Sequence, residues 1–363
     1  MIDKVTAAAY RIPTDQPEGD GTFAWQATTL VVATVTAAGA TGTGWTYAPA
    51  AAASLISETL AETVTGADAA DIPALWARMT RQVRNAGRPG VAGYAISAVD
   101  VALWDLKARL LDLPLVRLFG AAREHVPLYG SGGFTTYDDD ATTGQLGHWV
   151  HGQGIDRVKI KIGESSGTQP GRDLRRVALS RRVIGEAAEL YVDANGGYTA
   201  KQAIRMAERM SEHDVTWFEE PVSSDDLPGL RLVREHCRAD VTAGEYGCDL
   251  AYFTRMCQAQ AVDCLQIDAT RCGGYTGWFA AAAIAAGHNL QVSAHCAPNL
   301  HIPAAAATAN LRHIEWFHDH QRIESELFDG AADPAGGLVQ PQAGAPGHGL
   351  VLRAGAAECH RVA

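Results

Sequence analysis

Short apolar runs alternate with amphipathic stretches from Val126 to Trp316. In the amphipathic stretches apolar residues recur every three or four positions, which indicates helices, whereas the short runs indicate buried strands. This alternation is typical of parallel β/α units, and eight strands predict a barrel of the TIM type, whose chemistry lies at the carboxyl ends of the strands. A doubly wound open sheet is the alternative, but no glycine-rich phosphate loop follows any strand. The predicted strands are Val126–Gly130, Arg157–Ile162, Glu189–Val192, Val215–Phe218, Asp240–Ala243, Cys264–Ile267, Leu290–Ser293 and His313–Trp316, and helices are predicted at Asp173–Ala187, Ala200–Glu212, Leu230–Cys237 and Leu250–Ala261.

The first third of the chain has a different pattern. Alternating β-branched residues, clearest at Leu30–Thr36, predict antiparallel strands between Lys4 and Thr46, separated by the polar stretch Thr14–Thr22. Between Ala51 and Leu111 the apolar spacing becomes helical. We therefore predict an α+β domain over residues 1–124 and the barrel over residues 125–325. The glycine- and proline-rich residues 326–363 follow no regular pattern.

Composition narrows the function. The formal net charge of −11 over 363 residues disfavours a nucleic-acid partner, because phosphate binding needs a basic surface. The seven cysteines include no CxxC pair and are predicted to be reduced thiols. The first residues lack the pattern of a secretory signal, and the apolar stretch Trp278–Gly287 is too short to cross a bilayer. We expect a cytoplasmic protein that acts on a small molecule and has no membrane partner.

Carboxylates follow three successive predicted strands. They are Asp193 in VDANGG, Glu219 in FEEP and Glu245 in AGE, each 26 residues after the previous one. One β/α unit per step predicts that the three side chains lie at the same height on neighbouring strands. Hard oxygen ligands on a rigid sheet suit Mg²⁺. Helix capping would be the simpler role for each acid, but the equal spacing at three strand ends favours one shared metal ion.

Two lysines alternate with apolar residues in the second predicted strand, VKIKIG. Lys159 and Lys161 therefore point to the same side, and we expect both inside the barrel, paired with the carboxylates. Neighbouring lysines lower each other's pKa, which favours a role as a base. A solvated edge strand is the alternative for this short motif.

The sixth and seventh predicted strands are followed by Asp268 and His295. On adjacent strands these side chains can pair, with the carboxylate orienting one imidazole nitrogen while the other nitrogen faces a substrate. A structural histidine is the alternative, but the lysines expected across the metal favour a base.

These motifs together resemble the enolase superfamily, and within it the mandelate racemase subgroup, over essentially the whole chain. The matching segments are SAVDVALWDLKARLLDLP (Ser97–Pro114), VKIKIG, VDANGG, FEEP, AGE, DATRCGG and SAHCAPNLH. The resemblance implies a modified (β/α)7β barrel with an N-terminal α+β capping domain, completed by residues 326–363. It also implies one Mg²⁺ per subunit and a homo-oligomer.

The resemblance also implies roles for single residues. Lys161 would be the base on one face of the substrate, tuned by Lys159, and the His295–Asp268 pair would act on the other face. Asn195 would bind the substrate, and Glu315, at the end of the last strand, would bond its carboxylate or enolate. Asp193, Glu219 and Glu245 would hold the metal.

Such a site is expected to remove the proton next to a carboxylate and to stabilise the resulting enolate. We favour dehydration of an acid sugar to a 2-keto-3-deoxy acid. Polar residues near the barrel mouth, on the predicted loop Pro13–Trp25 and at Tyr47, suit a hydroxylated substrate. His318, Asp319 and His320 lie just beyond the last strand and are expected to contact either substrate or, more simply, the capping domain or a neighbouring subunit.

Other readings remain open. A racemase or epimerase would use the same site but keep the mass of its substrate. A non-catalytic metal-binding relative would be expected to lose its bases, whereas Lys161, Asp268 and His295 are all present. Muconate-type cycloisomerisation is disfavoured, because the sixth strand is followed by Asp268 and Arg271 where that chemistry uses a lysine.

Overall fold

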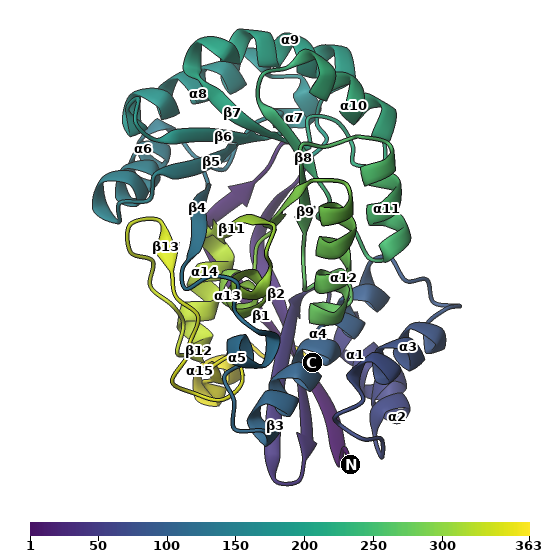
Figure 1. The fold of residues 1–363 in the computed structure, drawn as a ribbon. Helices are drawn as coiled ribbons and strands as arrows, with labels where there is room; N and C mark the ends of the chain where they lie inside the picture. Colours follow the sequence, from purple (N-terminus) through teal and green to yellow (C-terminus); the bar gives the residue numbers. More distant parts are fainter.

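The centre of the computed structural model, which describes residues 1–363, is a barrel of eight parallel strands. The strands follow one another around the barrel in chain order, and β11 pairs with β4 to close it (Figure 1). All eight predicted strands are present, with ends shifted by at most two residues. Their bounds are β4 (Val126–Gly132), β5 (Arg157–Lys161), β6 (Glu189–Asp193), β7 (Val215–Glu219), β8 (Asp240–Ala243), β9 (Cys264–Ile267), β10 (Gln291–Ala294) and β11 (Leu311–Phe317).

Helices connect successive strands on the outside of the barrel (Figure 1). The four predicted helices are present, with ends shifted by at most three residues. Aspartates begin three helices: the side chains of Asp138, Asp226 and Asp249 accept hydrogen bonds from backbone N–H groups of the first turn. The connecting helices are α6 (Asp139–Gly147), α7 (Glu164–Gly167), α8 (Pro170–Ile184), α9 (Ala200–Met210), α10 (Leu227–His236), α11 (Leu250–Gln258), α12 (Gly274–Gly287) and α13 (Pro298–Ala307). Helix α14 (His318–Leu327) follows the last barrel strand, β11.

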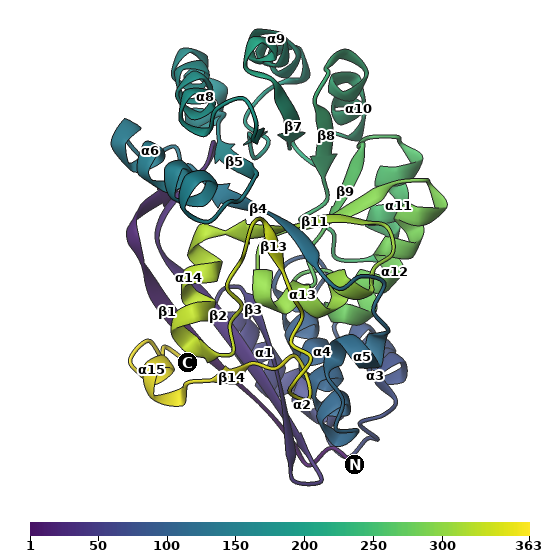
Figure 2. The same cartoon turned by 60° about the vertical axis from the view of Figure 1, so that its left-hand side comes forward.

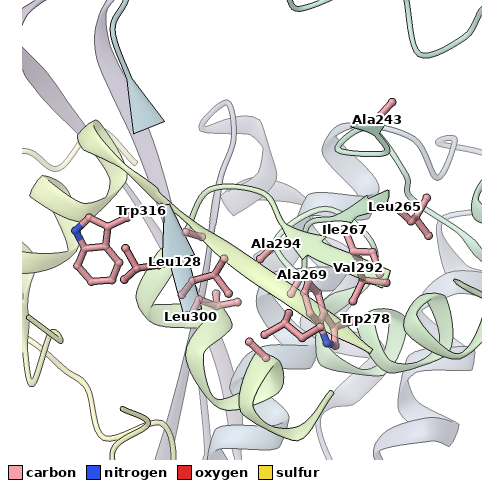
Figure 3. Close-up of a cluster of buried hydrophobic side chains, with 14 of the residues drawn as sticks. Leu128, Ala243, Leu265, Ile267, Ala269, Trp278, Val292, Ala294, Leu300 and Trp316 are labelled. Atoms are coloured by element: carbon pink, nitrogen blue, oxygen red, sulfur yellow. The ribbon is translucent and has the colours of Figure 1, made fainter. Parts of the chain in front are cut away.

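The main core lies between the barrel and these helices. Leu265 and Ile267 on β9 and Val292 on β10 are fully buried, together with Trp278 of α12 and Leu300 of α13 (Figure 3). Because alternate strand residues point to opposite sides, these apolar positions leave the next residues on each strand facing the barrel interior. The polar site residues therefore face inward because their apolar neighbours pack against the helices.

The N-terminal residues form the predicted antiparallel sheet, in the order β1 (Lys4–Gly19), β2 (Ala24–Ala37) and β3 (Ala40–Tyr47). The expected separation of strands by the polar stretch 14–22 is wrong, because β1 continues to Gly19 beyond an irregular pairing between Pro13 and Glu18. In this last part of β1, Glu18 is the strand-pairing partner of Trp25 on β2. The indole N–H of Trp25 also donates a hydrogen bond to the Glu18 carboxylate at 2.9 Å.

A long helix, α4 (Val91–Leu110), packs against β3. Gly42 and Gly44 permit this close approach: a Cβ at Gly44 would lie 2.3 Å from the carbonyl oxygen of Ala98. The other helices of this region are α1 (Ala51–Leu55), one π-helical turn (Ile56–Leu60), α2 (Ala61–Val64), α3 (Ile72–Gln82) and α5 (Leu115–Phe119).

The C-terminal segment returns to the N-terminal sheet. Figure 2 shows its last helix, α15 (Ala354–Glu358), beside the strands of that sheet. The backbone N–H groups of Ala9 and Arg11 on β1 donate to the carbonyls of Ala363 and His360, both at 2.8 Å. This segment contains β12 (Phe328–Asp329), β13 (Leu338–Val339), β14 (Val351–Leu352) and α15 (Ala354–Glu358), with β13 antiparallel to β4. None of the helices combines the length and apolar character needed to cross a membrane.

Candidate active site

Two of the three predicted metal ligands lie side by side at the end of the barrel. Asp193 and Glu219 are register partners at the last positions of β6 and β7, and both are fully buried. Glu245 differs from the expectation of equal height: Glu219 pairs with Thr242, so Glu245 lies three residues farther along, beyond the end of β8. It follows Gly244, whose φ of +138° and whose closeness to the Gln266 carbonyl leave no room for a side chain.

Both lysines of β5 point into the barrel and meet these carboxylates. The Lys159 Nζ lies 2.6 Å from Glu219 Oε1 and 2.9 Å from Glu315 Oε1. Lys161, the register partner of Asp193, donates to the Asp193 carboxylate. Lys159 is fully buried and Lys161 is 6% exposed. The expectation that acidic groups compensate the two buried charges is met.

The electrostatic balance differs from what the sequence predicted for the lysines. Burial and Lys159 lower the pKa of Lys161, but the Asp193 and Glu219 carboxylates outweigh both effects and raise it above its ordinary value. The Asp193 and Glu219 carboxylates therefore favour the ammonium form of Lys161. The same two lysines, acting against burial, hold the pKa of Asp193 below its usual range.

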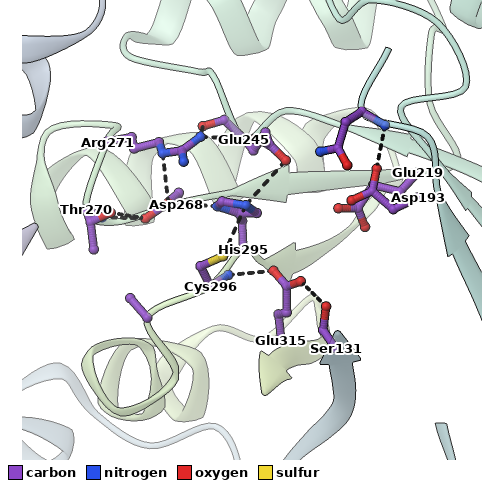
Figure 4. A network of polar contacts seen from close by, with 12 residues as sticks. Ser131, Asp193, Glu219, Glu245, Asp268, Thr270, Arg271, His295, Cys296 and Glu315 are labelled. Atoms are coloured by element: carbon purple, nitrogen blue, oxygen red, sulfur yellow. Dashed lines mark hydrogen bonds and ion pairs between the residues drawn. The ribbon is translucent and has the colours of Figure 1, made fainter. Parts of the chain in front are cut away.

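Asp268 and His295 form the predicted pair (Figure 4). The His295 Nδ1 lies 2.9 Å from Asp268 Oδ2, and its Nε2 lies 3.3 Å from Glu245 Oε2. Burial alone would lower the pKa of His295, but Glu245 and the bond to Asp268 raise it. With Nδ1 bonded to Asp268, Nε2 is the nitrogen that faces the barrel mouth.

Arg271 links this pair to the carboxylates, a role that its place in the DATRCGG motif did not reveal. Its Nη1 lies 3.1 Å from Glu245 Oε1, and its Nε lies 3.4 Å from Asp268 Oδ2. Burial opposes ionisation of Asp268, yet His295 and Arg271 hold its pKa below the ordinary value. A basic residue three positions after Asp268 was the only sequence signal for this contact.

Glu315 lies in the same network but has several partners of its own. Its carboxylate accepts hydrogen bonds from the Ser131 hydroxyl at 2.6 Å and the Cys296 backbone N–H at 2.7 Å, besides its contact with Lys159. Although burial opposes ionisation, Lys159 and His295 hold the pKa of Glu315 well below its usual range. Ser131 and Cys296 were not singled out from the sequence.

Asn195 lies beside Asp193 at the edge of a polar cavity of about 560 Å³. Its backbone N–H donates to Asp193 Oδ1 at 2.9 Å, whereas its side-chain oxygen is buried and has no hydrogen-bond partner. Glu220 also lines this cavity and has a buried carboxylate oxygen without a partner, and burial raises the pKa of that carboxyl. Buried polar atoms without partners therefore occur on residues adjacent to the predicted ligands Asp193 and Glu219.

The carboxylates fit a hard divalent cation. Asp193, Glu219 and Glu245 offer only oxygen donors, which Mg²⁺ prefers. Glu245 is 3% exposed, and its Oε2 has no hydrogen-bond donor, although an unpaired buried acceptor is unfavourable. Burial raises the pKa of Glu219 to about 7, so a cation at these oxygens would favour its ionised form.

Tyr47 contacts helix α14. Its hydroxyl lies 3.2 Å from Glu324 Oε1, and its ring stacks on His320 with 3.3 Å between centroids. His318 contacts Asp15 on β1 at 2.9 Å. Asp319 accepts from Thr28 on β2. The three residues after the last strand therefore contact all three strands of the N-terminal sheet. These contacts agree with the simpler of the two predicted roles, contact with the capping domain.

Family models match both parts of the chain. Residues 8–120 match the mandelate racemase / muconate lactonizing enzyme N-terminal domain, and residues 143–356 match the enolase C-terminal domain-like family. The chain belongs to the mandelate racemase/muconate lactonizing enzyme family of the enolase superfamily. The predicted family and the predicted barrel with an N-terminal capping sheet are confirmed.

Individual family members resemble the chain over most of its length. A 3,6-anhydro-α-L-galactonate cycloisomerase of Streptomyces coelicolor is 32% identical over 363 residues, covering 97% of each chain. An L-talarate/galactarate dehydratase of Salmonella typhimurium is 30% identical, covering 80% of this chain and 73% of its own. A mandelate racemase/muconate lactonizing enzyme-like protein of Rubrobacter xylanophilus has a TM-score of 0.96 and 44% identity, covering 99% of each chain.

The relatives carry out several kinds of reaction. They include dehydratases such as D-gluconate dehydratase, cycloisomerases and a hydrophobic dipeptide epimerase. Several similar structures were solved with magnesium, one of them a dehydratase with L-glucarate. Similarity to this family therefore supports an enzyme but leaves lyase and isomerase activities as alternatives.

Proposed function

We propose that this protein removes the proton next to a carboxylate with the help of one Mg²⁺ per subunit, and that its substrate is an acid sugar. One observation carries the proposal. Six consecutive barrel strands, β5 to β10, each supply one polar residue at the same end: Lys161, Asp193, Glu219, Glu245, Asp268 and His295. An amine and an imidazole thus stand at the two ends of an arc whose middle is formed by carboxylates.

Different residues of the chain carry out proton transfer, substrate binding and metal binding. His295 Nε2 accepts or returns a proton on one face, while Asp268 keeps the proton on Nδ1 and fixes the ring. Lys161 does the same on the other face once Asp193 no longer holds it as an ammonium ion. Asn195 offers its free side-chain oxygen to a substrate hydroxyl. A divalent cation on Asp193, Glu219 and Glu245 would stabilise negative charge developing on the substrate and offset the carboxylate field at Lys161.

Dehydration of an acid sugar is the favoured outcome. If the substrate has a hydroxyl on the carbon next to the enolate, protonated His295 can donate its proton to that hydroxyl as it leaves as water, and tautomerisation gives a 2-keto-3-deoxy acid. The cavity beside Asn195 is lined mostly by polar residues, among them Ser223, Ser224 and Asp225. This lining suits a substrate rich in hydroxyls, and relatives with dehydratase activity support the same choice.

Isomerisation is the second candidate. Two acid–base groups on different faces also suit racemisation or epimerisation, in which the second group returns a proton to the same carbon. The near full-length similarity to a cycloisomerase adds intramolecular ring chemistry to this class. These reactions keep the mass of the substrate, so mass spectrometry separates them from dehydration.

The test is a screen of purified protein with Mg²⁺ against mono- and diacid sugars, with 2-keto acid measured by semicarbazide absorbance. A signal that disappears in EDTA and returns with Mg²⁺ is expected. Compounds without a signal are then incubated in D₂O, where exchange of the α-proton without mass loss would identify an isomerase. If no acid sugar gives product or exchange, the proposed substrate class is wrong.

A further inference from the structure

A thiol lies against the nitrogen of His295 that faces the barrel mouth. The Cys296 Sγ lies 3.2 Å from His295 Nε2, and Figure 4 shows the sulfur pointing at the ring. Asp268 is bonded to the other nitrogen, Nδ1, at 2.9 Å. The lone pair of Nε2 is therefore available on the side where the sulfur lies.

Glu315 completes a group of three different donors. Each of the three residues His295, Cys296 and Glu315 offers one ligand atom, and these three atoms lie within 4.8 Å of one another. All three side chains are buried. The backbone fixes the direction of the thiol: Cys296 and Ala297 have φ of +50° and +39°, and the Cys296 N–H donates to Glu315 Oε2 at 2.7 Å. Two successive residues in the left-handed region are unusual and persist only where surrounding contacts hold them.

We propose that His295, Cys296 and Glu315 form a second metal site, selective for a borderline-soft divalent ion such as Zn²⁺ and distinct from the carboxylate site. Nitrogen, sulfur and carboxylate oxygen are the donors that Zn²⁺ takes in proteins, whereas Mg²⁺ takes oxygen. A tetrahedral zinc ion separates its sulfur and nitrogen ligands by about 3.6 Å. The observed 3.2 Å between Cys296 Sγ and His295 Nε2 needs only a small outward movement to reach this separation.

The surroundings of His295 support a ligand role. Histidines that bind metals usually donate their other ring N–H to a carboxylate, which fixes the ring, and Asp268 accepts from His295 in this way. Glu245 Oε2 also lies 3.3 Å from the same Nε2, but it belongs to the carboxylate set and is left to Mg²⁺.

Occupation of this site blocks the imidazole. When the ion binds, the Cys296 S–H proton goes to solvent, a metal–sulfur bond forms, and the Nε2 lone pair becomes a metal bond while Nδ1 keeps its proton. His295 can then neither take a proton from a substrate nor return one. Zinc inhibition rests on the proposed function, whereas zinc binding does not, so binding is measured first.

The binding experiment uses Cd²⁺ as a spectroscopic substitute, added to full-length protein saturated with Mg²⁺. A thiolate-to-cadmium absorption band is expected at one equivalent per subunit in the wild type and in the control Cys359→Ala, which removes an exposed thiol elsewhere. Cys296→Ala is expected to lose the band and bind Cd²⁺ more than about tenfold more weakly, since even outer-shell changes cost tenfold or more. Cys296→Ser, which keeps the size of the side chain, should also lose the band.

Two results would overturn the proposal. One is a band of equal strength and affinity in folded Cys296→Ala or Cys296→Ser. The other is Cd²⁺ binding that excess Mg²⁺ displaces without any thiolate band, which would place the ion on the carboxylates. If substrate turnover is found, Zn²⁺ should inhibit the wild type and lose potency in Cys296→Ala by the same factor as binding. Normal Cd²⁺ binding without turnover on any substrate would contradict the proposed function alone.

Discussion

Arg271 and His295 contact the same oxygen of Asp268. The His295 Nδ1 lies 2.9 Å and the Arg271 Nε lies 3.4 Å from Asp268 Oδ2, while Arg271 Nη1 reaches Glu245 at 3.1 Å. The guanidinium thus joins a predicted metal ligand to the predicted acid–base pair. A substitution at Glu245 is therefore expected to affect the Asp268–His295 pair, and a substitution in that pair is expected to affect Glu245.

Arg271→Met is expected to lower the stability of the protein. Removal of the guanidinium leaves two buried carboxylates with one cation fewer, and breaking a buried ion pair typically costs about 3–5 kcal/mol. Urea unfolding measures this loss, and Mg²⁺ should restore part of it because the cation compensates Glu245. Arg231→Met, which removes an exposed pair with Glu235, is the control and should change stability far less, because solvent screens an exposed pair. Equal losses in the two variants would show that the link to Asp268 and Glu245 adds no stability.

Removal of a carboxylate is expected to weaken magnesium binding. Asp193→Asn, Glu219→Gln and Glu245→Gln each remove one negative oxygen from the predicted ligand set, whereas Glu62→Gln changes an exposed acid far from it. Calorimetric titration should show one Mg²⁺ per subunit in the wild type and the control. In the three variants binding should weaken by about tenfold or more. Unchanged binding in any of the three would remove that residue from the ligand set.

The sequence predicted the barrel well because each strand alternates inward and outward residues. Lys159, Lys161, Asp193 and Glu219 follow from this alternation, since their apolar neighbours must face the helices. Residues beyond strand ends follow no such period. The height of Glu245 depends on the turn at Gly244, and the position of Cys296 depends on two left-handed residues, neither of which is visible as a hydrophobic pattern.

Contacts between segments that are distant in the sequence could not be predicted from the sequence patterns either. The stretch after Pro13 has the composition of a loop, yet pairing of Glu18 with Trp25 extends β1 to Gly19. Tyr47, expected near the barrel mouth, stacks its ring on His320, a contact that no sequence pattern specified. Tertiary packing decided both positions where local composition allowed more than one structure.

Asp100 is expected to make stability depend on pH. Burial raises the pKa of this carboxyl to about 7, and Thr276 of α12 donates to both of its oxygens. Its pKa in the unfolded chain is near the ordinary value of about 3.9. The folded protein therefore binds an extra proton between about pH 4 and 7. The stability from that proton is complete below this range and is lost as the pH rises through it, by up to about 4 kcal/mol.

Asp100→Asn is the test of this dependence. Urea unfolding at pH 5 and pH 8 should show a smaller loss of stability in the variant than in the wild type, because the amide cannot ionise. Asp112→Asn, an exposed position at the end of α4, should keep the wild-type dependence. A variant that loses as much stability as the wild type between the two pH values would assign the dependence to other groups.

Lys161→Ala and His295→Asn distinguish a one-base from a two-base reaction. A positioned general acid or base contributes about 10²–10⁴-fold to rate, so each variant should lose at least about 10²-fold in kcat if both faces of the substrate are used. If a single base performs both steps, only one variant will lose activity. Exchange of the α-proton in D₂O identifies the face that each residue serves, because a variant that lacks the second group can still exchange the proton at the first. Wild-type turnover in His295→Asn would reject the assignment of the His295–Asp268 pair, whatever the behaviour of Lys161→Ala.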